Sequence, residues 1–230
     1  MNYYGTQLKE ELKMEIKKFI KTHRNKSIII FHHFSLVYGF WLYGFDWKYI
    51  VLAIASAYIM FGLFAHAAHI HFSHRKFKSS IFNVIYAFMV NSANAIGGAF
   101  NFTVLHRHHH KFADTDQDPH SPTIIGAWRV YTLQWNHVKV NPVASRDIAS
   151  DKAMQFLHRH QVKLHFLSTA IFFLINPIIV FFVISPSVVY TFHVNGLVNW
   201  RGHLHGKPRN CPELALITPL SWRHGDHHNH

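Results

Sequence analysis

Histidine spacing constrains the fold of this 230-residue chain more than any other feature. The pattern HxxHH opens the stretch from His106 to Pro122 and recurs near the end of the sequence, and a pair spaced HxxxxH lies earlier. On a helix, residues i, i+3 and i+4 share one face, so HxxHH predicts three imidazoles pointing into one small volume. Separate clusters form one site only if the fold brings their segments together. The clustered histidines are His69 and His74, then His106, His109 and His110, then His224, His227 and His228.

Composition limits the ligands of such a site. The chain has 23 histidines but a single cysteine, Cys211, which excludes an internal disulfide and a cysteine zinc cluster. Imidazole suits iron, zinc, copper and nickel. The sequence therefore predicts a metal centre built from histidine, with help from asparagine or carboxylate side chains.

Apolar segments that alternate with polar ones predict an all-α membrane protein with about four transmembrane helices, each of roughly 20 residues. Residues 27–45 contain no Asp, Glu, Lys or Arg, a turn follows at 46–48, and residues 49–68 cross back. In the second hairpin we expect a kink at Pro177 and a turn at 185–187. The chain is predicted to form a single domain. It begins with an amphipathic N-terminal segment (1–26) and a transmembrane hairpin (27–68), followed by a cytosolic or interfacial part with the first two histidine clusters (69–164). A second transmembrane hairpin (165–200) and a C-terminal segment with the third cluster (201–230) complete it.

The apolar segment at 80–105 joins the first histidine cluster to the second. If both clusters build one site, both ends of this segment lie on one side of the membrane, so it cannot cross once. We therefore predict a re-entrant or interfacial helical hairpin with a bend near Gly97 and Gly98. Irregular backbone at membrane depth is tolerated only where it is buried in protein.

The first third of the chain has two further features. Residues 1–26 place apolar side chains at helical spacing among lysines, which predicts an amphipathic helix on an anionic membrane surface. A solvated helix that packs one stripe against the protein fits the same pattern. His32 and His33 lie inside the first apolar segment and are interpreted as neutral histidines bonded to neighbouring helices.

The placement of basic residues agrees with this topology. Of 23 Lys and Arg residues, only Lys48 lies on the predicted far side of the membrane, and the other 22 share a side with every histidine cluster. The positive-inside rule assigns that side to the cytoplasm. The net charge of +12 is thus explained by membrane topology and anionic lipid. Because no basic patch interleaved with aromatic residues stands out, no nucleic-acid partner is expected.

Four strings carry a resemblance to the integral-membrane fatty acid desaturases: HIHFSHRKF, HRHHHKFADTDQDPH, NWRGHLHG and RHGDHHNH. They resemble the histidine boxes of the Δ9 group, which includes stearoyl-CoA desaturases and bacterial acyl-lipid or acyl-CoA desaturases. The resemblance covers residues 49–230 in order and spacing. HxxHH alone is only moderately specific. The succession of HxxxxH, HRxHH with DPH, NxxxH and HxxHH between apolar segments is highly specific.

The resemblance implies a four-span fold with a cytosolic helical cap that holds two non-haem iron ions. It implies no catalytic residue beyond the metal ligands. Asn199 matches a position that approaches the metal through water, and Asp114, Asp118 and His120 are interpreted as hydrogen-bonding supports around the ligands. The implied ligands are His69, His74, His106, His109, His110, His203, His224, His227 and His228.

The first histidine pair is ambiguous from the residues alone. A spacing of i, i+5 places two side chains about 140° apart on a regular helix. Either the helix ends there, or His71 and His74 form the pair. The resemblance favours His69 and His74.

The chemistry explains why a metal is needed. An alkyl C–H bond has no polarity for an acid or base to exploit, so its cleavage needs an oxidant made from O₂ at a cofactor. The resemblance implies O₂-dependent introduction of a cis double bond, at Δ9, into a saturated acyl chain carried by CoA, lipid or acyl carrier protein. The electrons are expected from a separate ferredoxin or cytochrome b5-like donor, because the sequence has no haem motif of the HPGG type.

Three alternatives to an active desaturase are weighed. A membrane di-iron hydroxylase of an alkyl or lipid substrate would use the same histidines, but the DPH and NxxxH matches favour desaturation. A truncated or inactive desaturase is suggested because the sequence ends two residues after the last cluster and departs from the family before its second and third boxes. A histidine-rich metal transporter would place ionisable residues along a mid-membrane path, whereas these clusters fall at membrane ends.

Overall fold

The computed structural model describes residues 26–66, 68–93, 98–135, 140, 142–206, 211 and 214. Within this part of the chain all regular structure is helical and no strand occurs, which confirms the all-α prediction for these residues. The predictions for the N-terminal amphipathic segment and for the third histidine cluster lie outside the described residues. The helices are 26–43, α2 (Trp47–Met60), the π-helices η1 (Phe61–His66) and η2 (His69–Ser73), α3 (Ile81–Ala93), α4 (Gly98–Phe112), α5 (Pro122–Ile125), α6 (Ala127–Tyr131), the 3-10 helix η3 (Pro142–Ser145), α7 (Arg146–Ala149), α8 (Lys152–Ile175), α9 (Pro177–Ile179), the π-helix η4 (Val180–Ile184) and α10 (Ser185–Gly202).

Two continuous helical segments among the described residues are long and apolar enough to cross a membrane, Trp47–Ser73 and Pro177–Gly202. The segment of α3 is apolar but shorter. The first hairpin turns where we expected: the side chain of Asp46 caps α2 by accepting a hydrogen bond from the backbone N–H of Lys48, 3.0 Å away. Two segments of the described residues therefore meet the length and composition of a transmembrane helix, and the second of them runs across the predicted turn between the third and fourth spans.

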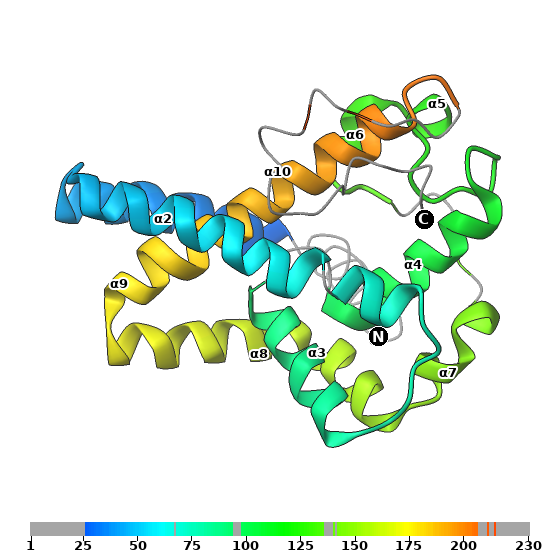
Figure 1. The fold of residues 1–230 in the computed structure, drawn as a ribbon, viewed down its shortest axis with the longest axis horizontal. Helices are drawn as coiled ribbons and strands as arrows, with labels where there is room; N and C mark the ends of the chain where they lie inside the picture. The colour runs from blue at the N-terminus through cyan, green and yellow to red at the C-terminus, as the bar shows by residue number, and fades with distance from the viewer. Residues whose placement is uncertain are drawn as a thin grey trace, which may run out of the picture.

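The prediction of a turn at 185–187 in the second hairpin is wrong. The chain instead turns between α8 and α9, at the sharp corner in Figure 1, where Asn176 is extended with φ −161° and ψ 116°. A residue before proline is pushed out of the helical region, and Pro177 suits the first position of the next helix because it needs no N–H donor there. The Asn176 side chain accepts from the N–H of Ile178, and helical structure then continues through Ser185 into α10.

The apolar segment at 80–105 forms two helices, α3 and α4, which pack on each other and on α8 (Figure 1). This arrangement agrees with the predicted helical hairpin. At its turn Gly98 has φ +75°, a conformation that glycine adopts without a steric penalty. A Cβ at this position would overlap the side-chain oxygen of Asn91, which accepts the N–H of Ala99 at 3.1 Å. Gly97, the other predicted bend residue, lies outside the described residues.

A buried polar seam supports the end of α3. The last carbonyls of a helix have no partner within it, and here His165 Nδ1 donates to the Asn91 carbonyl at 3.1 Å and Ser187 Oγ to the Ala93 carbonyl at 3.1 Å. His32 lies 2.7 Å from the other ring nitrogen of His165 and 2.8 Å from Ser185 Oγ. His33 contacts His193 on α10, with 3.2 Å between the two Nε2 atoms. Both histidines of the first apolar helix are thus bonded to neighbouring helices, as predicted.

Candidate metal centre

The first histidine pair is brought together by a π-helix. In η2 the backbone hydrogen bonds run from i to i+5, so residues five apart stack over one another instead of diverging. His74 caps η2 at its C-terminus, and its Nε2 lies 2.9 Å from Nε2 of His69. His71, the alternative member of the pair, contacts the side-chain oxygen of Asn83 instead, at 2.8 Å. The structure therefore joins His69 and His74 at the site.

Four histidines converge into what we call the four-histidine cluster: His69, His74, His106 and His110. The Nε2 of His106 lies 2.7 Å from that of His69, 3.2 Å from that of His74 and 2.9 Å from that of His110. A neutral imidazole nitrogen carries one proton or one lone pair, so hydrogen bonding cannot satisfy three such neighbours. Nitrogens held 2.0–2.1 Å from one ion would lie roughly 2.9–3.4 Å apart. This geometry fits a metal site.

The electrostatics of this cluster favour neutral ligands. Burial and the neighbouring imidazoles of His69 and His110, with smaller effects of His109 and His74, hold the pKa of His106 well below its ordinary value. A neutral imidazole keeps the lone pair that a metal needs. The cluster is not sealed, because His74 and His110 are exposed at its edge.

The HxxHH stretch on α4 serves two clusters rather than one. His106 and His110, four residues apart, have ring centroids 4.4 Å from each other, whereas His109 is 6.2 Å from His106 and contacts His203 at 4.7 Å. Successive residues on a helix are rotated by about 100°, so the adjacent His109 and His110 diverge. The expectation of three imidazoles in one volume is corrected to two volumes on one helix face.

A second group, the histidine–carboxylate cluster, surrounds His109 and consists of His109, His120, His203, Asp114 and Asp118. His109 Nδ1 lies 3.0 Å from both carboxylate oxygens of Asp118, and His203 Nδ1 lies 2.9 Å from Asp114 Oδ2. A carboxylate at Nδ1 fixes the tautomer and leaves Nε2 to bind a metal. The structure thus places two of the three predicted supports directly against two predicted ligands.

Asp118 is fully buried and ionised. Burial raises its pKa, but the hydrogen bond from His109 and the nearby His120 outweigh this effect and hold the pKa well below its ordinary value. Its oxygens also accept the backbone N–H groups of Asp114 at 2.7 Å and His120 at 2.9 Å. To make this turn Asp114 adopts φ +58°, which aspartate tolerates better than most residues. The acidic loop after α4 therefore folds around one carboxylate.

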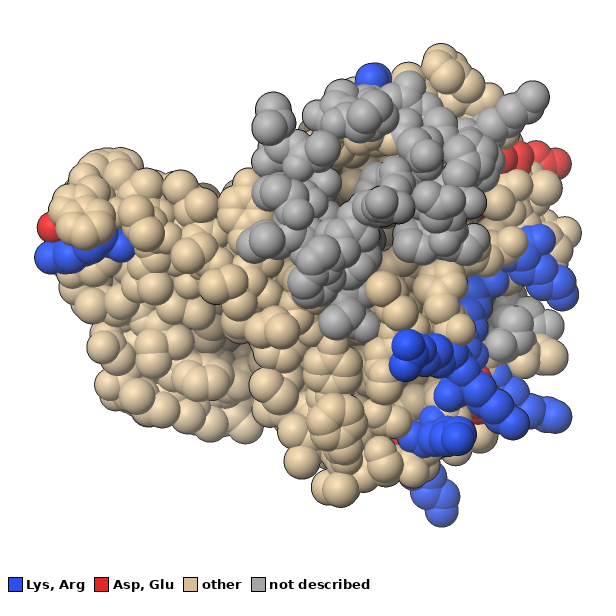
Figure 2. Space-filling model, viewed as in Figure 1, with Lys and Arg blue, Asp and Glu red and all other residues tan. Residues whose placement is uncertain are grey.

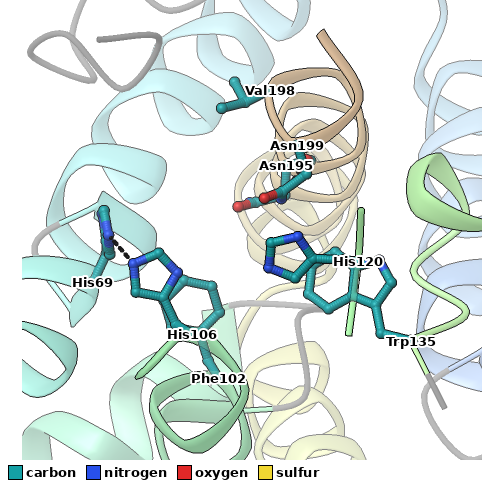
Figure 3. A pocket seen from close by; sticks show the side chains of 8 residues that line it. All are labelled: His69, Phe102, His106, His120, Trp135, Asn195, Val198 and Asn199. Atoms are coloured by element: carbon teal, nitrogen blue, oxygen red, sulfur yellow. Dashed lines mark hydrogen bonds between the residues drawn. The ribbon is translucent and has the colours of Figure 1, made fainter. Parts of the chain in front are cut away.

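A small cavity of about 20 Å³ lies between the two clusters, with room for about one water molecule. Figure 3 shows its lining: His69 and His106 on one side, His120 on the other, and the amide side chains of Asn195 and Asn199 from α10 pointing toward the space between them. The lining residues are His69, Phe102, His106, His120, Trp135, Asn195, Val198 and Asn199.

The cavity shows which residues sequence reasoning missed. His120, predicted only as a support, lines the space itself. Asn195 precedes Asn199 by one helical turn and accepts its amide N–H at the backbone carbonyl, 2.8 Å away, so the i, i+4 spacing could have identified it. Nothing in the sequence pattern marks Trp135. The predicted ligands of the third cluster lie outside the described residues.

Comparison with known proteins finds fatty acid desaturases among the relatives of this chain. No protein-family model matches the chain. This chain is 30% identical to an sn-1 stearoyl-lipid 9-desaturase of Synechocystis sp. over 206 residues. The matched region covers 80% of this chain and 62% of the relative. It is 28% identical over 221 residues to a chloroplastic palmitoyl-monogalactosyldiacylglycerol delta-7 desaturase of Arabidopsis thaliana, covering 88% of this chain and 57% of the relative. A Delta(9)-fatty-acid desaturase of Caenorhabditis elegans is 26% identical over 232 residues, 93% of this chain and 67% of the relative. The chain thus spans about three fifths of the length of the first two relatives.

Proposed function

We propose that the chain, which is similar to fatty acid desaturases over most of its length, is an O₂-dependent membrane oxidoreductase that introduces a cis double bond into a saturated acyl chain. The single observation that carries the proposal beyond the homology is the convergence of two histidine groups around one cavity. Desaturation needs such an arrangement, because two adjacent C–H bonds must be cleaved at one place.

The proposed cofactor is a pair of non-haem iron ions. One would be held by the four-histidine cluster and the other by His109 and His203, with Asn199 reaching the metal through water. His224, His227 and His228 remain predicted ligands. The imidazole donors fit iron, although such donors also bind zinc tightly. When bound, iron would supply the O₂-derived oxidant that alkyl C–H cleavage requires.

The protein's own residues would bind the metal ions, orient the histidine ligands and shield the cavity from water. Asp118 and Asp114 hold His109 and His203 in the tautomer that presents Nε2. Phe102, Trp135 and Val198 give the cavity an apolar wall that limits the access of bulk water. In the balanced reaction one O₂, two electrons and two protons convert a CH₂–CH₂ unit into CH=CH and two molecules of water. The electrons would come from a separate ferredoxin or cytochrome b5-like protein.

The proposed substrate and regiochemistry are based on the names of the relatives. Three of the relatives are named as acting on lipid-linked chains and others as acyl-CoA desaturases, so we propose a fatty acyl substrate and keep CoA, lipid and acyl carrier protein as its carriers. The name 9-desaturase recurs among them, which supports Δ9.

We also propose a four-span topology with the metal centre on the cytoplasmic side. Large apolar side chains lie exposed on the first two helices and on α8, among them Phe34, Trp41, Ile54 and Leu174, as lipid contact would require. Of the Lys and Arg side chains that Figure 2 colours on this face, most gather at the end of the molecule that carries α7, and a broad region of uncharged residues separates them from the tip where α2 begins. Membrane lipid is therefore a proposed partner.

The proposal is tested by the fatty acid profile of a membrane host that expresses the chain with a ferredoxin and its reductase. A new cis-monounsaturated acid is expected, lost in His109→Ala and retained in His205→Ala, whose side chain is exposed after α10. The position of the double bond in this product shows whether the regiochemistry is Δ9. A hydroxylated lipid in its place would favour the hydroxylase. An unchanged profile, with metal-loaded protein in the membrane, would contradict the proposal.

A further inference from the structure

Arg107 connects the two histidine segments of the four-histidine cluster. It follows His106 on α4, and its guanidinium reaches the loop that carries His74. There it donates to three backbone carbonyls on either side of His74: from Nη2 to Phe72 at 2.9 Å, from Nε to Ser73 at 2.9 Å and from Nη2 to Arg75 at 2.6 Å. One side chain thus fixes the backbone before and after a predicted ligand.

Asp147 holds this guanidinium in place. Its carboxylate accepts from Arg107 Nη1 at 2.6 Å and from Nη2 at 3.2 Å, and it also accepts the backbone N–H of Phe77 at 2.6 Å. The two side chains are only 15% and 14% exposed. Burial raises the pKa of Asp147, but the hydrogen bonds from Arg107 and Phe77 outweigh it and keep the pKa below its ordinary value. A two-pronged arginine–carboxylate pair of this kind has a fixed geometry.

His74 needs such support because it lies beyond the end of η2. The last carbonyls of a helix have no partners within the helix, and the guanidinium supplies donors to those of Phe72 and Ser73. His74 is also exposed, unlike the buried His69. The backbone on either side of it therefore sets where its Nε2 lies relative to those of His69 and His106, 2.9 and 3.2 Å away.

We propose that Arg107 and Asp147 form a clasp that positions His74 in the four-histidine cluster, so that loss of the clasp selectively weakens one of two metal sites. The inference rests on the proposed function only in that these histidines bind metal. Arg107 is a positioning residue, not a catalytic one, because its contacts are with backbone and Asp147.

The chain offers matched controls. Arg75 is exposed, and within the described residues no hydrogen bond to its guanidinium is found, so Arg75→Gln removes a nearby charge but keeps the carbonyl that the clasp uses. Arg146→Gln likewise removes an exposed charge, here from the residue next to Asp147. Arg107→Lys keeps the charge but cannot reach three carbonyls and a carboxylate at once. Asp147→Asn is the milder variant, because it keeps the shape of the side chain.

The test uses the detergent-solubilised full chain, stripped of metal and titrated with cobalt(II), with thermal unfolding as a check on folding. Wild-type protein and Arg75→Gln are expected to bind two ions. Arg107→Lys is expected to lose about 10–100-fold in affinity for one ion and none for the other, as for other changes that disturb a ligand's support, and Asp147→Asn to lose less.

A double-mutant cycle shows whether the effect passes through His74. In a His74→Ala background the further change Arg107→Lys is expected to have no effect on cobalt binding, because the ligand that it positions is gone. The clasp would be overturned if Arg107→Lys lowered the cobalt affinity equally in the wild-type and His74→Ala backgrounds. It would also be overturned if Arg107→Lys lowered the affinity for both ions equally. Normal binding by Arg107→Lys would overturn the clasp alone, whereas a wild-type chain that binds no cobalt would overturn the metal centre as well.

Discussion

At the scale of single residues, buried carboxylates determine how the histidines are presented. Asp118 is fully buried, yet it stays ionised because His109 and two backbone N–H groups all donate to it. An ionised group in such a place is stable only while every donor is present. The same side chain therefore supports the fold of the acidic loop and the orientation of His109.

The first prediction concerns this carboxylate. Asp118→Asn replaces an acceptor by an NH₂ group that must face a donor, which leaves a buried polar group unsatisfied and costs about 1–3 kcal/mol. Metal affinity at the His109 site is expected to fall about 10–100-fold. Thermal unfolding and metal titration measure the two effects. Asp116→Asn, an exposed change in the same loop, is the control, and equal behaviour of the two variants would contradict the prediction.

The second prediction is a pH dependence at Asp147. Because its pKa is lower in the folded protein than in the unfolded chain, its stabilisation is fully present above the unfolded value of about 3.9 and is lost as the pH falls through the folded value. The difference in unfolding free energy between wild type and Asp147→Asn is therefore expected to be about 1–3 kcal/mol at neutral pH. It should shrink below about pH 4. Chemical denaturation at several pH values measures it, and a difference that grows in acid would contradict the assignment.

At the scale of elements, the position of the site depends on how helices end. The π-helix η2 ends at Ser73 with His74 as its C-cap, α3 ends in a buried seam of hydrogen bonds, and α4 starts at a glycine with positive φ. The first of these ends carries His74, and the other two form the turn that leads into the histidines of α4. The histidines of α4 therefore depend on a bend that lies two helical turns before His106.

The third prediction tests this bend. Gly98→Ala combines an unfavourable left-handed backbone with an overlap against Asn91, and the loss of the hydrogen bond from Ala99 to Asn91 adds to both. Destabilisation of about 2–4 kcal/mol is expected. Gly44→Ala has a similar φ of +78° but nothing within 4 Å, so only about 1 kcal/mol is expected. Thermal unfolding in detergent compares them, and equal losses would show that the close approach to Asn91 carries no cost.

At the scale of the whole molecule, charged side chains are scarce along the apolar helices, whereas histidines occur both there, as His32 and His33, and in the two clusters. The only acid–base pair at the tip where α2 begins is Asp46 with Lys48, 3.1 Å apart, within the part of the chain that the structure describes. The candidate metal ligands lie at the other end of the continuous segment Trp47–Ser73, on α4 and just after α10. A lipid bilayer across the uncharged middle would place these two ends on opposite sides.

The fourth prediction tests that topology. In a Cys211→Ser background, Lys48→Cys and Lys78→Cys each provide one exposed thiol. A membrane-impermeant maleimide added to intact bacterial cells is expected to label position 48 and not position 78, and to label both after the cells are broken. Labelling of both positions in intact cells would exclude a cytoplasmic metal centre.

Much of this architecture follows from local sequence. Hydrophobic length predicts helices, and the spacing of His106 and His110 predicts their shared face, because both depend on residues within a few positions. At Pro177 the sequence predicts a kink, whereas the structure turns at Asn176, because proline is tolerated both as a kink and as the first residue of a new helix. Chain-local patterns do not distinguish these two uses.

The sequence by itself determined the helical class, the hairpin at 80–105 and the histidines that are candidate metal ligands. Only the tertiary structure decided which histidines lie together: a π-helix brought His69 to His74, and the rotation of α4 turned His109 away from His106. Arg107 joins the backbone on either side of His74 to Asp147. The physical reason is that ligand grouping depends on contacts between segments far apart in sequence. Such contacts arise from packing and from the hydrogen bonds that end each helix, which no local spacing encodes.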